Sequence, residues 1–164
     1  MSVSAEALVR YLSRSYQAVD GLWFMLAEEA GDFEQALELD RRVWEVLAKI
    51  QARQAREVLG CPGYSPPELA RCLELKLVAD GHNFGLTVEP GEVRVTVRAC
   101  PWLELLRKSG RDHLALRVAQ TICPLEGEVW CREFGGEYDF EMPQMACSGE
   151  PQCVMRYVRR SLPA

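Results

Sequence analysis

The sequence predicts an α+β fold, in which an N-terminal segment of three helices packs with an antiparallel four-stranded sheet and further helices. Two observations lead to this prediction. Apolar residues recur every three or four positions through the first 80 residues, which is the spacing of one helix face. Beyond residue 83 the period switches twice to two, the alternation of a strand with one buried face, and a helical stretch separates the two switches. Helices combined with separate strand pairs are typical of the α+β class.

The first two helices have clear ends. Apolar residues at helical spacing run through 5–30, and Gly31 ends this first helix. Asp32 and Gln35 form a capping-box-like pattern, in which each side chain satisfies an unpaired amide at the start of the second helix. That helix should end at Gly60, because glycine tolerates the left-handed turn that follows many helices.

A third helix and a hairpin follow. The run Ser-Pro-Pro-Glu at 65–68 is a strong helix start, with a capping serine and proline in the first turn. This helix should continue to about Asp80 and stop at Gly81. Apolar residues then alternate with polar ones at 84–88 and 93–97, with Pro-Gly between, which predicts a two-stranded hairpin.

The last third repeats the change from helix to hairpin. Helical stretches are expected at 101–108 and 112–133, the second broken at Pro124, because proline removes a helix hydrogen bond. Apolar residues alternate again at 138–142 and 153–157, which predicts the second strand pair.

Length and composition indicate one ordinary globular domain with a helical part at 1–80 and an α+β part at 83–160. The chain has 164 residues, of which 48% are hydrophobic and 26% charged. A net charge of -5 argues against a nucleic-acid partner, since phosphate binding uses clustered Lys and Arg. The N-terminus has no targeting pattern, and the longest apolar run is far shorter than the ~20 residues that span a bilayer. We therefore expect a cytoplasmic protein without a membrane partner.

Seven cysteines are many for a cytoplasmic chain, and an odd number cannot all pair internally. They form no C-x-x-C motif, but several lie at the ends of predicted elements, where different segments can meet. Converging cysteines would suit zinc or an iron–sulfur cluster. Free cysteine is also a common small core residue, which is the alternative role, most strongly for Cys72. The candidate metal ligands are Cys100, Cys123, Cys147 and Cys153.

The C-terminal half resembles a known family. Its motif consists of Val95-x-Val97-x-x-Cys100-Pro101, then Gly127, then Cys147-x-Gly149-Glu150-Pro151-x-Cys153. This pattern is similar to the 4-vinyl reductase small-molecule-binding domain, although Glu150 replaces an Asp and the spacing before Gly149 is one residue shorter. The resemblance implies binding of a hydrophobic or aromatic small molecule, sometimes with a metal at the cysteines.

The N-terminal half has a second resemblance. Its motifs are Trp23-Phe24-x-Leu26-x-x-Glu29 and Leu37-x-Leu39-Asp40-x-x-Val43-Trp44. They look like uncharacterised bacterial proteins grouped with L-2-amino-thiazoline-4-carboxylate hydrolases. That resemblance implies ring opening of a small cyclic substrate with a cysteine in the site.

A hydrolase would need an activated cysteine, and the candidate pair is Cys131 with His113 as its base. The only other histidine is His82, which is expected in a turn. His113 has a simpler alternative role as a partly exposed residue in the first turn of a helix. The pair depends on the fold bringing the two residues together.

Aromatic residues beside the cysteines are candidates for ligand contact, because pockets for apolar ligands are lined by such side chains. Trp102 lies two residues after Cys100, and Trp130 adjoins Cys131. Tyr157 on the last predicted strand completes the predicted ligand-binding set. Packing in the core is the alternative role for each tryptophan.

Three functions are compatible with these features. The first is a small-ligand or metal-binding protein with a cysteine-lined pocket, favoured because cysteines are plentiful and histidine is scarce. The second is the cysteine hydrolase. The third is an interaction protein that dimerises through its first two amphipathic helices, and we expect a homodimer.

Overall fold

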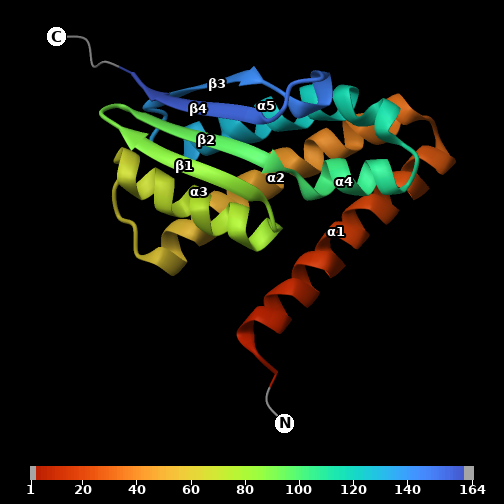
Figure 1. Ribbon diagram of the computed structural model, residues 1–164, viewed down its shortest axis with the longest axis horizontal. Helices are drawn as coiled ribbons and strands as arrows, with labels where there is room; N and C mark the ends of the chain where they lie inside the picture. The colour runs from red at the N-terminus through yellow and green to blue at the C-terminus, as the bar shows by residue number, and fades with distance from the viewer. Residues whose placement is uncertain (1–2, 161–164) are drawn as a thin grey trace.

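The computed structural model describes residues 3–160. Within this range the chain forms five α-helices, two short 3-10 helices and one four-stranded antiparallel sheet (Figure 1). The predicted α+β class is therefore confirmed. Among the described residues, each helix is either too short or too polar to cross a membrane.

The two long N-terminal helices begin at side-chain caps. Helix α1 spans Ala5–Ala30, and the Ser4 hydroxyl accepts the amide N–H of Ala7. Helix α2 spans Phe33–Leu59, and the Asp32 carboxylate accepts the N–H of Gln35 at 2.9 Å. These caps satisfy amides that have no partner inside a helix, which is why they fix where each helix begins.

Helix α3 spans Pro66–Asp80 and starts with the predicted capping box, in which Glu68 accepts the Ser65 N–H. The hairpin of β1, Asn83–Glu89, and β2, Glu92–Ala99, follows it directly. Short connections of this kind keep α3 beside the sheet that the hairpin begins.

The connection between the two hairpins consists of α4, Pro101–Lys108, a 3-10 turn at Asp112–Leu114, and α5, Ala115–Glu133. The predicted break at Pro124 is wrong, because α5 continues through it. A helical proline loses one backbone hydrogen bond. Burial of Ile122, Val129 and Trp130 on the same helix offsets that loss.

The second hairpin consists of β3, Tyr138–Gln144, and β4, Cys153–Arg159, joined by a loop with a 3-10 turn at Ala146–Ser148. The strand order is β1-β2-β4-β3, so β3 is an edge strand. Its ladder with β4 is irregular between Glu141 and Gln144, where Pro143 has no N–H to donate.

One face of the sheet is buried beneath helices. Val93 lies opposite Tyr157, Val95 opposite Met155, and Val97 opposite Cys153. This inner face packs with residues of α2, α3 and α5 in a single core, as the layering in Figure 1 shows. The outer face carries charge.

The charged outer face is held together across three strands. Arg156 on β4 forms salt bridges to Glu92 on β2, at 2.6 Å, and to Glu141 on β3. Because this charged face lies opposite the buried apolar face, apolar and polar residues alternate along each strand, and this alternation predicts the strands.

Helix α5 lies unusually close to the sheet. A Cβ atom at Gly127 would be 2.4 Å from the ring of Phe140 on β3, a separation that side chains do not tolerate. Glycine at this position therefore permits the approach. The close contact sets the position of the part of α5 that faces a cavity on its other side.

Candidate functional site

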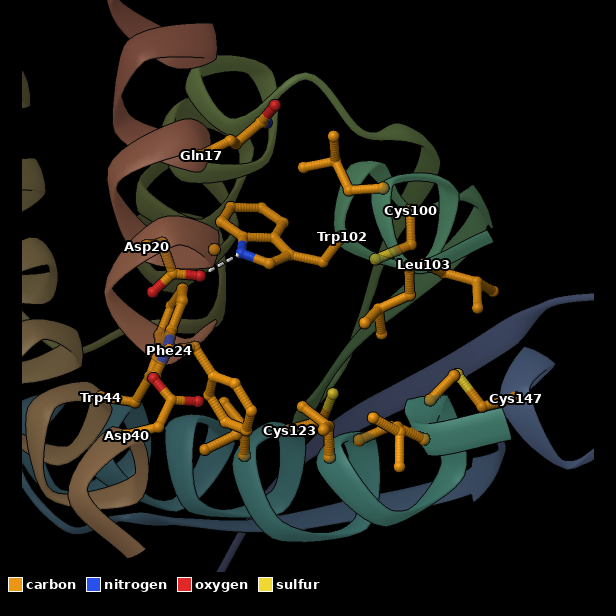
Figure 2. A pocket seen from close by; sticks show the side chains of 18 of the residues that line it. Gln17, Asp20, Phe24, Asp40, Trp44, Cys100, Trp102, Leu103, Cys123 and Cys147 are labelled. Atoms are coloured by element: carbon orange, nitrogen blue, oxygen red, sulfur yellow. Dashed lines mark hydrogen bonds between the residues drawn. The ribbon is translucent and has the colours of Figure 1, made fainter. Parts of the chain in front are cut away.

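A cavity of about 340 Å³ lies between α1, α2, α4, α5 and the segment that joins β3 to β4. Its wall is mostly apolar, with contributions from Phe24, Leu103 and Ile122. A volume near 300 Å³ with few polar groups is typical of sites for small organic molecules. Figure 2 shows how the side chains from these elements surround the space.

Helix α1 contributes two polar side chains and one aromatic side chain to this wall. Gln17, Asp20 and Phe24 face the cavity at spacings of three and four residues, so they lie on one side of the helix. The Gln17 amide donates to the backbone carbonyl of Asp80, with Nε2 and O 2.8 Å apart. This bond ties α1 to the end of α3.

Trp102 on α4 is the centre of an aromatic cluster. Its indole Nε1 donates to Oδ2 of Asp20 at 2.8 Å (Figure 2). Its ring centroid lies 5.6 Å from that of Trp44, 5.9 Å from Tyr16 and 5.9 Å from His82. Edge-to-face and stacked pairs at these distances are favourable. The cluster joins α1, α2 and α4 at one end of the cavity.

Two carboxyl groups lie at this aromatic end. Asp40 of α2 is only 6% exposed, and Asp20 of α1 is also partly buried. Burial, and then the charge of Asp20, raise the pKa of Asp40 to about 7, while the indole of Trp44 opposes the rise. Burial likewise raises the pKa of Asp20, against the indoles of Trp102 and Trp44. Each carboxylate therefore resists ionisation in this environment.

The basic groups in the cavity wall already have acidic partners. Lys76 forms salt bridges to Asp80 at 2.8 Å and to Glu126 at 2.9 Å. Arg111 is paired with Glu28. Within residues 3–160, Asp20 and Asp40 have no salt bridge. The aromatic end of the cavity is therefore acidic without a compensating protein cation.

His82 does not supply that compensation. Burial, and then the nearby charge of Lys76, lower the pKa of His82 to about 4. The imidazole is therefore neutral near pH 7. Its Nδ1 is buried, and no hydrogen-bond partner for it exists in the described part of the chain.

The four predicted metal ligands all line the cavity, although they come from different segments. Burial is the main cause of a raised pKa for Cys100, to about 11, and it also raises the pKa of Cys123 and of Cys147. Cys153 accepts the amide N–H of Ala146 at 3.2 Å. Over residues 3–160, no three His, Cys, Asp or Glu side chains are arranged to hold a metal ion.

The predicted catalytic pair is wrong. His113 is exposed in the turn before α5, whereas Cys131 is buried near the other end of that helix. The sixteen-residue separation of Ala115 and Cys131 along α5 corresponds to roughly 24 Å at 1.5 Å per residue. Burial also raises the pKa of Cys131 to about 12, the opposite of what an activated thiol requires.

The predicted ligand-binding aromatics divide into two groups. Trp102 lines the cavity, as described above. The prediction of ligand contact is wrong for Trp130 and Tyr157, because both side chains are buried in the core. Trp130 stacks on Phe134 at 6.0 Å, and Tyr157 packs against Phe140 at 5.1 Å. Adjacency to a cysteine in sequence did not distinguish these core residues from residues of the cavity wall.

Sequence reasoning missed Asp20 and Asp40 as site residues. A usable signal was present, because Asp40 follows Leu37 by three positions and precedes Trp44 by four, on the apolar face of α2. Asp20 likewise follows Tyr16 by four positions and precedes Phe24 by four. An acidic residue within an apolar helix face is a marker of function when it has no partner on the same helix.

Comparison with known proteins places the chain in a family. Residues 2–101 match a model described as a family of unknown function (DUF6125). No curated protein matches the chain. The matched segment contains α1 to α3 and the first hairpin, so it includes both carboxyl residues but ends just before Trp102. Because the match covers more than half of the sequence, the chain belongs to this family of unknown function.

Proposed function

We propose that the protein binds a small, mainly apolar organic molecule in the cavity. The observation that carries this proposal is the cavity itself: about 340 Å³, walled largely by apolar side chains, with a few polar groups gathered at one end. Such a combination is the usual form of a small-molecule site. The resemblance of the C-terminal half to 4-vinyl reductase-type domains supports the same function.

In this proposal the cavity thiols are wall residues. A cysteine that attacks a substrate or binds a metal acts as a thiolate, which a lowered pKa favours. Cys100 and Cys123 have raised pKa values, because burial disfavours the charged thiolate. A neutral thiol behaves as a small apolar group. The proposal therefore assigns binding and no reaction to the site.

The proposal can be tested by filling the cavity. Ala119 of α5 lines it, whereas its neighbour Gln120 is exposed. We expect the wild-type protein to bind the uncharged dye N-phenyl-1-naphthylamine saturably, with an increase in dye fluorescence. Ala119→Trp should abolish this signal, and the matched control Gln120→Trp should retain it. Circular dichroism would establish that both variants are folded.

Equal dye binding by all three proteins would contradict the proposal, since it would place the dye elsewhere on the molecule. A wild-type protein that does not bind the dye, together with calorimetry that detects no uptake of small aromatic molecules, would also contradict it. Metal analysis of the same preparation would show whether zinc or iron accompanies the cysteines. Near-stoichiometric metal would replace the organic ligand with a metal centre as the function.

Self-association through α1 and α2 is a second candidate function. Much of α1 extends away from the rest of the molecule in Figure 1 and carries large apolar side chains on its exposed side. At spacings of three, four or seven residues these are Leu8, Leu12, Val19, Leu22 and Leu26. Helix α2 has a similar exposed row at Leu39, Val43, Val46 and Ile50. Alternating spacings of three and four are those of helices that pack against partner helices.

A second copy of the chain is the partner that we propose for these rows. Two α1–α2 hairpins packed face to face would form a four-helix arrangement. Stable interfaces bury on the order of 800 Å² per partner, and apolar patches of monomers seldom exceed about 600 Å². Nine large apolar side chains of α1, each at least 41% exposed, form a surface that a second copy would cover.

Light scattering during gel filtration, over a range of concentrations, would test this dimer. We expect Leu22→Glu combined with Val46→Glu to give the monomer mass, because charge would be placed inside the interface. The matched control combines Arg14→Glu with Lys49→Glu, at exposed positions away from the two rows. It adds more negative charge but should leave the dimer intact. A wild-type monomer at all concentrations would exclude self-association.

A further inference from the structure

We propose that the ligand of this cavity carries a protonated amine, held between the carboxyl groups of Asp20 and Asp40, with its apolar remainder in the rest of the cavity. This inference rests on the proposed small-molecule function and specifies the chemical class of the ligand. It follows from the arrangement of charge, burial and aromatic rings at one end of the cavity.

The two carboxyl groups converge from different helices. Asp20 lies on α1 and Asp40 on α2, and in Figure 2 both lie beside Phe24 and Trp44 at the same end of the cavity. Asp40 is buried, with only 6% of its surface exposed to solvent. It forms no salt bridge with a Lys, Arg or His of residues 3–160. A buried acid that faces a cavity and has no protein cation is a group that a ligand can satisfy.

The other charged side chains of the cavity wall do not compensate the charge of Asp20 and Asp40. Lys76 is already shared between Asp80 and Glu126, and Arg111 is bound to Glu28. Neither cation forms a salt bridge to Asp20 or Asp40. Burial of a carboxylate without a partner is costly, whereas a well-placed cation with hydrogen bonds offsets much of that cost. A ligand ammonium group would supply that cation and N–H donors.

The aromatic rings around the pair favour the same ligand class. Trp44 and Trp102 meet edge to face at 5.6 Å, and Phe24 lies beside them in the cavity wall. Aromatic faces attract organic cations, most strongly where water is excluded. Carboxylates combined with tryptophan rings thus recognise a cationic head group and reject an anionic one.

The other end of the cavity specifies the remainder of the ligand. Cys100, Leu103 and Cys147 line it, and these side chains are apolar. A molecule that fills both ends has a charged amine at one end and a hydrocarbon or aromatic body at the other. The volume of about 340 Å³ admits a body of one or two aromatic rings.

A pair of matched probes separates this inference from the proposed function. 4-Phenylbutylamine and 4-phenyl-1-butanol have the same number of non-hydrogen atoms and differ in charge. At pH 8, in competition with N-phenyl-1-naphthylamine, we expect the amine to bind the wild-type protein about ten- to a hundredfold more tightly than the alcohol. That range is typical of a hydrogen bond to a charged group.

Substitutions then locate the recognition. Asp40→Asn and Asp20→Asn should each reduce binding of the amine by about tenfold or more while leaving binding of the alcohol nearly unchanged. The control Glu29→Gln, an exposed acid on α1 outside the cavity wall, should alter neither. Because the comparison of amine with alcohol is made first in the wild-type protein, it does not depend on whether a variant folds.

Three outcomes would overturn the inference. If the dye binds and the alcohol competes as well as the amine, the cavity has no preference for a cation, although the proposed function stands. If Glu29→Gln weakens the amine as much as Asp40→Asn does, the preference comes from the overall charge of the protein. If calorimetry detects no binding of dye, amine or alcohol, both the inference and the proposed function fail.

Discussion

Trp102 donates its indole N–H to the carboxylate of Asp20, with Nε1 and Oδ2 2.8 Å apart. The two residues lie 82 positions apart in the sequence, so this bond connects the first helix to the segment between the two hairpins. The ring of Trp102 also contacts Tyr16, Trp44 and His82. One side chain thereby joins the elements that form the aromatic end of the cavity.

The first prediction concerns this bond. Trp102→Phe preserves an aromatic ring but removes the donor, so Asp20 loses its hydrogen bond. We expect a decrease of about 1 to 3 kcal/mol in the free energy of unfolding, measured by urea denaturation. Trp23→Phe is the control, because Trp23 is 45% exposed on α1. A loss no larger than that of the control would mean that the bond to Asp20 contributes little to stability.

The second prediction compares two acids of similar burial. Asp40 is 6% exposed and has no salt bridge, whereas Asp80 is 4% exposed and is paired with Lys76 at 2.8 Å. Asp40→Asn should raise the stability of the ligand-free protein, since it removes an uncompensated buried charge. Asp80→Asn should lower it by roughly 2 to 4 kcal/mol, because it removes one partner of a buried pair. Thermal unfolding at pH 8 provides the measurement.

If both substitutions destabilise the protein alike, Asp40 has a stabilising partner and the cavity lacks the charge deficit that we infer. This comparison requires no ligand. It therefore tests the electrostatics of the site independently of the binding experiments.

The third prediction is a pH dependence. The pKa of Asp40 is raised from its ordinary 3.8 to about 7, so the folded protein binds a proton more tightly than the unfolded chain does. Its contribution to stability is therefore fully present below pH 3.8 and is lost as the pH rises through 7. Asp40→Asn lacks this titration.

We expect the wild-type protein and Asp40→Asn to be most alike in stability below pH 3.8, and the wild-type protein to be already less stable at pH 5, where Asp40 is ionised in the unfolded chain but protonated in the folded protein. The variant should become more stable by roughly 2 to 4 kcal/mol at pH 8. His82 titrates in the opposite sense, because its pKa is lowered, but it is present in both proteins and its effect cancels in the difference. A difference that is constant from pH 5 to 8 would contradict the raised pKa of Asp40.

The fourth prediction concerns the contact between α5 and the sheet. Gly127→Ala would place a methyl group against the Phe140 ring, and we expect a loss of about 1 to 3 kcal/mol in unfolding free energy. Gly21 is also helical, but no atom lies within 4 Å of the position of its Cβ. Gly21→Ala should therefore stabilise the protein by about 0.5 to 1 kcal/mol. Equal effects of the two substitutions would refute the close packing at Gly127.

The helix starts and the strand pairs could be predicted because their causes are local. Asp32, Ser65 and Gly60 act through hydrogen bonds or backbone conformation within a few residues, and the structure has the helix ends where these signals place them. The break at Pro124 could not be judged in the same way. Whether a proline interrupts a helix depends on packing from other segments, which a local pattern does not contain.

The candidate site was less predictable because it depends on long-range contacts. The chain brings Asp20 to Trp102 across 82 residues, and no spacing rule predicts that pairing. Cys131 and His113 could pair only if the fold brought them together, and a continuous α5 holds them apart. Asp40 could have been noticed as an acid on an apolar helix face, but its lack of a cation is visible only in three dimensions.

The most direct test of the central claim is an NMR titration of the four tryptophan indole N–H signals with 4-phenylbutylamine. Trp44 and Trp102 line the cavity, whereas Trp130 is buried in the core and Trp23 lies outside the cavity wall on α1, so the last two are internal controls. We predict saturable shifts of the Trp44 and Trp102 signals, with the Trp23 and Trp130 signals nearly unmoved. Absence of shifts, or equal shifts of all four signals, would contradict binding of a cationic ligand in this cavity.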